Sequence, residues 1–356
     1  MKKRVVIVAI VLIILTGSMF LMAACCGSGC QAPDQTPEGF QIAFNLGQEW
    51  ESAFGTNFPQ VALIARRSIA ETNPGLVQYV ANMFETSSQF ARANPQETER
   101  MINSLGSPYL AGSPIANFLV DRGEQVVNFG HAAVNQVAIT NFLTTLHATN
   151  PPSVGGSVPS SDFFFMGSDA VSTGTETISI YLPDGPPLIA AAYLFYNEPQ
   201  IAGRNVNFVS VTAANLMPAI ASPQGPDFAL VPINMAAQHR ANYVVAGVAL
   251  WSLLHIVENA SLTGGTSSLS DLIGETIFAY QPNLTPGVVL GAIFANANIE
   301  VNWKNIGDAK NPNAVNIVDV ANNANARNAL LGLNAAIGYA RFALIAEPVA
   351  TSLLVL

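Results

Sequence analysis

The stretch ISIYLPDGPPLIAAAYLFY (residues 178–196) decides the fold class, because it joins a short apolar strand, a turn rich in proline and an apolar helix. The alternation repeats downstream, with strands predicted at Asn207–Val211 and Phe228–Val231 and helices at Ala214–Ile220 and from Asn234. Alternating strands and helices favour a parallel sheet covered by helices. The sequence therefore predicts an α/β fold.

The pattern restarts after a long apolar segment, Tyr243–Val257, which we interpret as one strand. Beyond SSLSDLI (residues 267–273), the expected elements are a strand at Thr276–Tyr280, a helix from Thr285, and strands at Ile299–Trp303 and Phe342–Ile345. Two strand–helix groups joined by one long strand predict two lobes that share a hinge.

The region before residue 161 is predicted to be mainly helical. A buried strand at Pro59–Ile64 comes first, and Asn-Pro pairs then open two helices, because proline suits the first helical position. The helices are expected from Asn73 through Phe84, from Asn94, at Pro114–Arg122 and at Ala132–Leu146. The segment Asn150–Ser161 has no periodicity and marks a change of organisation.

Composition restricts the class of protein. Of the 356 residues, 50% are hydrophobic and 10% are charged, which excludes a disordered or fibrous chain. The net charge is −9, and the only basic residues after Arg4 are Lys304, Lys310 and scattered arginines. Nucleic-acid binding needs clustered cations, so no nucleic-acid partner is expected.

Residues 1–30 have the pattern of an export signal: a basic start, an apolar run and small residues before a cysteine. The segment Leu21-Met22-Ala23-Ala24-Cys25 resembles the lipobox of bacterial lipoproteins, which implies lipidation at Cys25, with Cys26 as the other candidate. An uncleaved transmembrane anchor over Val5–Ala24 is the alternative. Both place the rest of the chain outside the cytoplasm, and all three cysteines lie in this region, so no cysteine catalysis follows.

The half of the chain from Ile178 to Leu354 is similar to the solute-binding proteins of ABC importers in the nitrate, sulfonate and thiamine-pyrimidine-precursor group. Five motifs carry the resemblance in the family's order: ISIYLPDGPPLIAA, PDFALVPINMAA, VAGVALWSLLHIV, SLSDLIGETIFAYQPNLTPGVVLGAIFANANI and ALIAEPVATSLL. The resemblance implies the periplasmic-binding-protein type II fold, with two βα lobes joined by two crossover strands, here Tyr243–Val257 and Val61–Arg66. It also implies a monomer that captures a small solute and delivers it to a membrane permease and its ATPase.

The other half resembles the carboxyl end of the same family, although it comes first here. Segment Gln41–Phe165 carries LGQEW, PQVALIARRSIAETNP and NPPSVGGSVPSSDFFF, and MGSDAVSTGTE (residues 166–176) links it to the family's usual first strand. The chain therefore resembles a circular permutation, in which Leu354 and Phe44 should be neighbours. The expected segments are a signal (1–24), a tether (25–40), part of lobe 2 (41–60), a crossover with helices mainly of lobe 1 (61–165), a linker (166–177), the lobe 1 core (178–250) and lobe 2 (251–356).

Ligands of such lobes bind where loops leave the carboxyl ends of the strands. The candidate residues are Pro183, Asp184, Gly185, Pro186, Thr212, Ala213, Pro232, Ile233 and Asn234 in lobe 1, and Trp251, Gln281, Asn283, Leu284, Thr285 and Glu347 in or near lobe 2. Simpler roles stay open for several: Asp184 and Thr285 as turn and cap residues, Trp251 as core, and Glu347 as part of the hinge.

The absence of Lys and Arg from these positions favours a neutral or weakly basic solute, such as a planar nitrogen heterocycle related to thiamine pyrimidine precursors, over nitrate or a sulfonate. The family also includes a pyridoxal-phosphate enzyme, but Lys304 and Lys310 lie in the polar segment WKNIGDAKNPN, which is typical of a solvated loop. No histidine pair has metal-ligand spacing. We expect no catalysis, cofactor or metal. A lipid-anchored structural or adhesion protein is the third alternative. Two lobes with a polar-lined groove would favour solute binding over it, and a single continuous core would refute the solute-binding interpretation.

Overall fold

The computed structural model describes residues 39–172, 174–197, 200–262, 265–280, 284–333 and 339–354. Residues 37–356 belong to one compact unit. The predicted export signal and Cys25 therefore lie outside the described residues.

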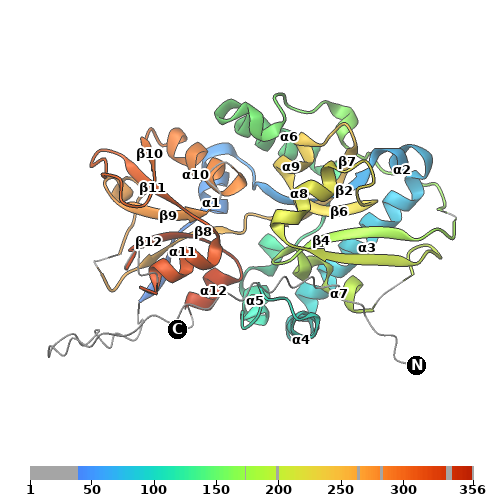
Figure 1. Ribbon diagram of the computed structural model, residues 1–356, viewed down its shortest axis with the longest axis horizontal. Helices are drawn as coiled ribbons and strands as arrows, with labels where there is room; N and C mark the ends of the chain where they lie inside the picture. Colours follow the sequence, from blue (N-terminus) through green and yellow to red (C-terminus); the bar gives the residue numbers. More distant parts are fainter. Residues whose placement is uncertain are drawn as a thin grey trace, which may run out of the picture. The chain divides into compact units, whose positions relative to one another are not determined.

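Twelve strands of the described chain form two sheets of six (Figure 1). Sheet I has the order β3 (Gly130–His131), β7 (Tyr243–Trp251), β2 (Pro59–Arg66), β6 (Phe228–Pro232), β4 (Ile178–Pro183) and β5 (Val206–Val211). Sheet II has the order β1 (Phe40–Asn45), β8 (Leu254–Asn259), β12 (Phe342–Ala346), β9 (Thr276–Tyr280), β11 (Val315–Val320) and β10 (Val301–Lys304). The α/β class is confirmed, but both sheets are mixed rather than purely parallel.

The two sheets share one strand order. In sheet I, β5, β4 and β6 run parallel, β2 is antiparallel to β6, and β7 is antiparallel to β2. In sheet II, β11, β9 and β12 run parallel, β8 is antiparallel to β12, and β1 is antiparallel to β8. Strands β2 and β8, which run opposite to the parallel set of their sheets, each follow a strand of the other sheet, since β1 leads to β2 and β7 leads to β8. Strands β3 and β10 extend the sheets at their edges.

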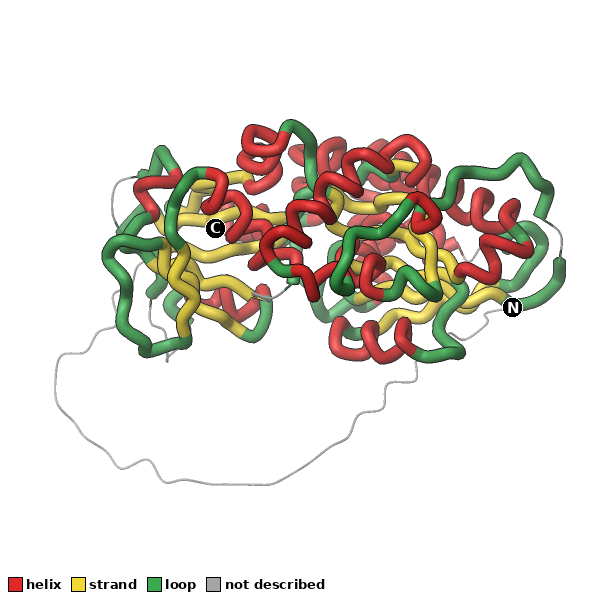
Figure 2. Tube along the Cα trace, turned by 90° about the horizontal axis from the view of Figure 1, so that it is seen from above, coloured by secondary structure: helices red, strands yellow, loops and turns green. Residues whose placement is uncertain are grey.

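Helices lie on both sides of each sheet (Figures 1 and 2). Around sheet I, α6 and α9 lie on one side and α3 and α7 on the other; around sheet II, α10 and α1 lie opposite α11 and α12. The bounds are α1 Leu46–Phe54, α2 Arg67–Thr72, α3 Pro74–Ala93, α4 Pro95–Leu105, α5 Ile115–Val126, α6 Ala132–Thr149, α7 Pro187–Asn197, α8 Ala213–Ala221, α9 Ile233–Gln238, α10 Thr285–Asn296, α11 Asn323–Leu330 and α12 Val349–Leu354. Short 3-10 turns span Pro151–Val154, Ser161–Phe163 and Leu269–Leu272.

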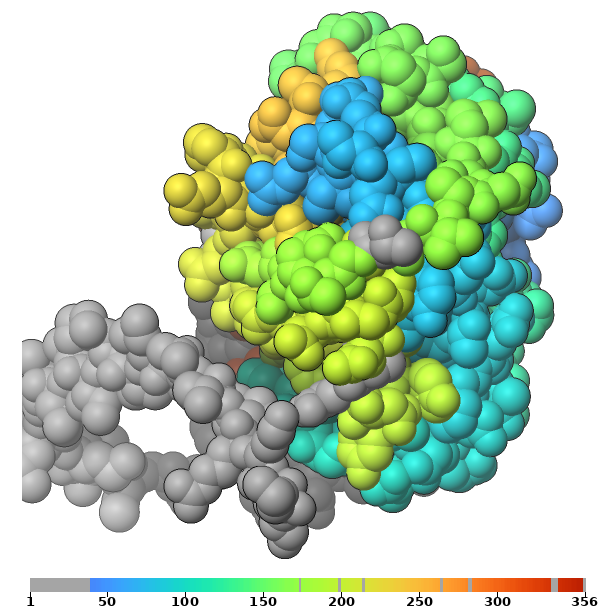
Figure 3. All heavy atoms as spheres, turned by 90° about the vertical axis from the view of Figure 1, so that its right-hand side faces the viewer, coloured from blue at the N-terminus to red at the C-terminus, as the bar shows by residue number. Residues whose placement is uncertain are grey.

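Helix α12 packs on β1, which places the last described helix beside the first described strand. This is the neighbourhood that the rearranged order predicts for Leu354 and Phe44. Residues 166–172 lie alongside the first turns of α3. The Ser168 amide donates to the Gln78 side chain at 3.3 Å, and a Cβ on Gly75 would lie 2.1 Å from the Ala170 carbonyl oxygen. Figure 3 shows this side of the unit, with α2 and the start of α3 in blue. Gly75 lets the segment approach the helix so closely.

The buried apolar side chains of both sheets belong to one connected core. Part of the connection is aromatic: Trp50 of α1 lies 5.6 Å from Phe58 and 5.0 Å from Phe142 of α6, measured between ring centroids. Because α1 packs against β1 and β8 while α6 packs against β7, this cluster joins the surroundings of sheet II to those of sheet I.

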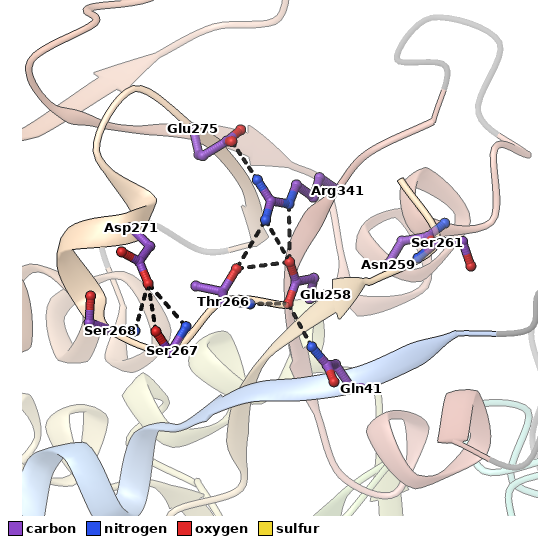
Figure 4. A network of polar contacts seen from close by, with 10 residues as sticks. All are labelled: Gln41, Glu258, Asn259, Ser261, Thr266, Ser267, Ser268, Asp271, Glu275 and Arg341. Atoms are coloured by element: carbon purple, nitrogen blue, oxygen red, sulfur yellow. Dashed lines mark hydrogen bonds and ion pairs between the residues drawn. The ribbon is translucent and has the colours of Figure 1, made fainter. Parts of the chain in front are cut away.

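A buried ion pair holds sheet II together (Figure 4). Glu258 of β8 is fully buried and accepts hydrogen bonds from Arg341 at 2.8 Å, Gln41 of β1 at 2.8 Å and the Thr266 hydroxyl at 2.8 Å. Arg341 also donates to Glu275 at 2.7 Å. Burial by itself would raise the pKa of Glu258, but these hydrogen bonds outweigh it and lower the pKa below its ordinary value.

We predict that Arg341→Met lowers the free energy of unfolding by about 3–5 kcal/mol, because it leaves the Glu258 carboxylate buried without its cation. The double variant Glu258→Gln with Arg341→Met should lose less than Arg341→Met alone, since no uncompensated charge remains. Urea unfolding of the three proteins measures this. Equal losses for the single and the double variant would contradict the argument.

Candidate functional site

The two crossings of the chain between the sheets lie side by side. The Ser252 amide donates to the Phe58 carbonyl at 3.2 Å, and the Leu253 amide donates to the Gln60 side chain at 2.8 Å. Ser252 has a φ of 25°, which L residues rarely adopt. The prediction of one strand over Tyr243–Val257 is therefore wrong: β7 ends at Trp251, the backbone turns at Ser252, and β8 begins at Leu254 in the other sheet.

The first predicted loop of sheet I is fixed by residues that precede α5. Asp184 accepts a hydrogen bond from the Ser107 hydroxyl, and its own amide donates to the Val211 carbonyl at 2.9 Å. Gly185 has a φ of 124°, and a Cβ there would lie 3.2 Å from the Tyr109 ring. The glycine is needed both for its backbone conformation and for the approach of Tyr109. Pro183 ends β4, and Pro186 precedes α7.

Asn234 and Thr285 are brought together although they come from different sheets. Asn234 lies in α9 directly after β6, Thr285 opens α10 after β9, and the Thr285 hydroxyl donates to the Asn234 side-chain oxygen at 3.0 Å. Their exposures are 1% and 3%. The structure thus joins two of the predicted loops by a buried polar contact, with Pro232, Ile233 and Leu284 beside them in the chain. Gln281 and Asn283 lie outside the described residues.

A second polar contact between the sheets involves Tyr109 and Asn323, which the sequence analysis missed. Asn323, the first residue of α11, donates to the Tyr109 hydroxyl at 3.1 Å and accepts from the Ala346 amide at 3.0 Å. Burial raises the pKa of the Tyr109 phenol. Burial also raises the pKa of the Tyr280 phenol, and the electrostatic effect of Tyr109 raises it further. Both phenols therefore stay neutral at physiological pH. The sequence did carry a signal for this position, because Asn322 is a residue type that caps helices and the Asn325 amide donates to its side chain. It could have predicted a helix start directly after a strand.

Glu347 follows β12 and is fully buried. Its carboxylate accepts from Arg122 of α5 at 2.6 Å and from the Thr351 hydroxyl at 2.8 Å, and it lies 3.1 Å from His255 Nε2. Burial by itself would raise the pKa of Glu347, but the His255 hydrogen bond and the Arg122 charge lower it overall. Burial lowers the pKa of His255, so this imidazole is neutral. Both carboxylate oxygens have protein partners, which favours the hinge role for Glu347.

The remaining predicted residues have local roles in the structure. The Trp251 indole donates to the Asn128 carbonyl at 2.8 Å, and the ring lines a cavity of about 350 Å³ that contains none of the other predicted residues. Thr212 precedes α8 without capping it through its side chain, and Ala213 opens that helix. Among the described residues, no cluster of three or more His, Cys, Asp and Glu has metal-binding geometry.

Apart from the Asp184 carboxylate, which accepts from the Ser107 hydroxyl and forms no ion pair with a described residue, the region between the sheets offers neutral hydrogen-bonding groups. Asn234, Asn323, Thr285 and Tyr109 each donate and accept hydrogen bonds. Arg122 carries a positive charge, but the Glu347 carboxylate lies 2.6 Å from its guanidinium and matches that charge. Such an arrangement suits a neutral polar ligand held by directional hydrogen bonds.

Comparison with protein-family models, with curated proteins and with solved structures found no match to this chain. In the part of the chain that the structure describes, no helix is both long enough and apolar enough to span a bilayer.

We predict that the protein loses stability on acidification below about pH 6.5, the ordinary pKa of histidine. The lowered pKa of buried His255 means that the unfolded chain takes up this proton first, so the free energy of unfolding falls by up to about 1.4 kcal/mol per pH unit. Stability does not change above the pKa that His255 has in the unfolded chain, and it stops falling once the pH is below the pKa that His255 has in the folded protein. Glu347, whose pKa is also lowered, adds a further loss below its ordinary value of 4.5.

Urea unfolding between pH 7.5 and pH 5 measures the slope. His255→Gln should flatten it, whereas His147→Gln, in a partly exposed part of α6, should not. An unchanged slope in His255→Gln would refute the assignment.

Proposed function

We propose that this chain is an extracytoplasmic, lipid-anchored solute-binding protein that captures a small molecule between its two sheets and delivers it to an ABC importer. The observation that carries the proposal is the buried contact between Asn234 and Thr285, which joins loops at the carboxyl ends of strands from two sheets that share the order of five strands. Loops at that edge are where α/β sheets bind ligands.

The connectivity supports the type II arrangement in permuted order. In both sheets the last strand of the parallel set, β6 or β12, lies next to an antiparallel strand, β2 or β8, that has come from the other sheet. Two crossings held side by side at Ser252 and Leu253 form a short hinge about which the sheets can separate and close. Closure about such a hinge would link ligand occupancy to a shape that a permease recognises.

The side chains favour a neutral or weakly basic solute. Amide, hydroxyl and phenol groups dominate the contacts between the sheets, and Arg122 is neutralised by Glu347. A sulfonate or nitrate would have to rely on neutral donors alone at these positions, which is weaker than recognition by arginine. A planar nitrogen heterocycle, with donors and acceptors along its edge, is the ligand class that we propose.

The continuous apolar core is the observation that argues against solute binding and for a structural protein. Part of that continuity runs through Trp50, Phe58 and Phe142 near the crossings, where any hinge between two sheets must be packed. The contacts between the sheets at the strand ends are polar, unlike the apolar packing near the crossings. For this reason we favour solute binding over an adhesive role.

We predict that one class in a panel of pyrimidines, thiamine precursors, nitrate, alkanesulfonates and amino acids raises the melting temperature. A ligand at a hundredfold excess over its Kd stabilises the native state by about 2.7 kcal/mol, which is several degrees. Asn234→Ala and Thr285→Val should each weaken binding at least about tenfold in calorimetry, since a lost buried hydrogen bond costs on the order of 1.4 kcal/mol. Asn82→Ala, on the exposed face of α3, is the matched control. Equal binding by Asn234→Ala and the parent would refute the site, and no shift with any class would favour the structural alternative.

We predict that Cys25 carries the lipid. In a bacterial host fed a labelled fatty acid, the full chain should incorporate label and sediment with membranes. Cys25→Ser should lose the label, whereas Cys26→Ser should keep it. Label retained in Cys25→Ser and lost in Cys26→Ser would move the anchor by one residue, and membrane association without label would favour an uncleaved transmembrane segment.

A further inference from the structure

A pocket of about 360 Å³ lies on sheet II away from the contacts between the sheets. Its floor is a row of side chains on three neighbouring strands, because Lys304 of β10 is in register with Val318 of β11, and Val318 with Phe278 of β9. Lys310 and Ile306, from the loop between β10 and β11, line it as well. This volume lies within the range of about 300–1,000 Å³ that is typical of small-ligand sites.

The pocket holds the lysines that have no carboxylate partner. Seven of the chain's arginines lie within ion-pair distance of an acidic side chain: Arg66, Arg67, Arg92, Arg100, Arg122, Arg204 and Arg341. Neither Lys304 nor Lys310 forms an ion pair with a described carboxylate; Lys304 donates to the Asp308 backbone carbonyl. These are the lysines of the chain outside residues 1–4. Unmatched cations on an acidic protein make this pocket a local site for an anion.

Arg341 borders the pocket but brings little surplus charge. Figure 4 shows its guanidinium between the carboxylates of Glu258 and Glu275, at 2.8 and 2.7 Å. Glu275 lines the pocket as well, and Arg341 with its two carboxylates carries a net charge of −1, so the two lysines supply the positive charge and leave a net charge of about +1 there. Thr276 adds a polar group, because its hydroxyl is buried at the edge of the pocket and has no hydrogen-bond partner within the described chain.

Exposed apolar side chains surround the lysines. Leu262, Ile306 and Tyr339 line the pocket and are 43%, 49% and 55% exposed. Lysines interspersed with exposed aliphatic and aromatic groups are typical of surfaces that rest on a bilayer, where apolar groups enter the interface and ammonium groups meet phosphates.

The chain enters the described structure beside this pocket. The Ala260 amide donates to the Gly39 carbonyl at 2.8 Å, and Leu262, two residues further on, lines the pocket. If Cys25 carries a lipid, the chain up to Gly39 spans at most about 50 Å. The lipid anchor would then keep this end of sheet II near the membrane.

We propose that the pocket lined by Lys304 and Lys310 binds the phosphate of an anionic phospholipid headgroup, seating this end of sheet II on the membrane surface. The lysines hold the phosphate, the Thr276 hydroxyl is available as a further donor, and Ile306 and Tyr339 contact the interface. Thr276 and Arg341 lie at the amino-terminal ends of β9 and β12, and Lys304 is in register with Phe278 in the middle of β9, whereas the proposed solute site lies beyond the carboxyl ends of β6 and β9. Seating on the membrane would therefore leave the solute site open.

The test uses residues 37–356, which contain every described element in one compact unit and lack the predicted lipid anchor. Sedimentation with vesicles of phosphatidylglycerol mixed with phosphatidylcholine should recover the protein, and vesicles of phosphatidylcholine alone should not. Lys304→Gln with Lys310→Gln should weaken binding on the order of thirtyfold, since each lysine near an anionic surface contributes about 1 kcal/mol. Ile306→Ser should weaken it by a smaller factor.

Arg92→Gln with Arg100→Gln is the matched control, because it removes the same charge from α3 and α4, beside sheet I. Binding unchanged in the control and lost in the lysine variant supports the proposal. Equal loss in both, or no binding to anionic vesicles, overturns it. A melting-temperature rise with inorganic phosphate that needs the lysines, without vesicle binding, also overturns the lipid assignment in favour of a soluble phosphate ligand. Solute binding is measured separately, so either proposal can fail alone.

Discussion

The side-by-side crossing of the chain between the sheets is the constraint on which the rest of the structure depends. Two hydrogen bonds, from Ser252 to Phe58 and from Leu253 to Gln60, hold the crossings together. Because each crossing strand becomes the antiparallel member of the sheet that it enters, the parallel strands on either side end at the same junction. The meeting of Asn234 with Thr285 is a consequence of this connectivity.

Buried charge near the junction is balanced locally. Arg122 comes from a helix that packs on sheet I, while Glu347 and His255 come from sheet II, so this ion pair ties the two halves at a second place. A buried pair of this kind costs desolvation energy, and its value is more in fixing one geometry than in net stability. Separation of the sheets would expose Glu347 and Arg122 to water, which lowers the electrostatic cost of opening.

Local pattern predicted much of the fold. The strand Thr276–Tyr280 and the helix from Thr285 are confirmed, because apolar runs and a proline at the helix start are local signals. Periodicity did not reveal the break at Ser252, since the apolar run continues across it and the turn depends on φ at one residue. Strand β11 and helix α11 were missed, because the stretch NAVNIVDVANNANA (residues 313–326) is rich in asparagine, which is typical of loops. Tyr109 and Asn323 were missed for a different reason: their roles come from a tertiary contact between segments far apart in the chain.

The distribution of cations connects the two proposed sites. Arginine, with its planar fork of donors, is used here for ion pairs that hold the structure together, and Arg122, Arg204 and Arg341 are matched by carboxylates. Lysine is a flexible point charge that adapts to headgroups of variable position, and Lys304 and Lys310 lie on a single surface. The neutral groups lie at the junction of the sheets, and the lysines without a described carboxylate partner line a pocket elsewhere on sheet II. The neutral junction suits a small polar solute, and the cationic pocket suits an anionic surface.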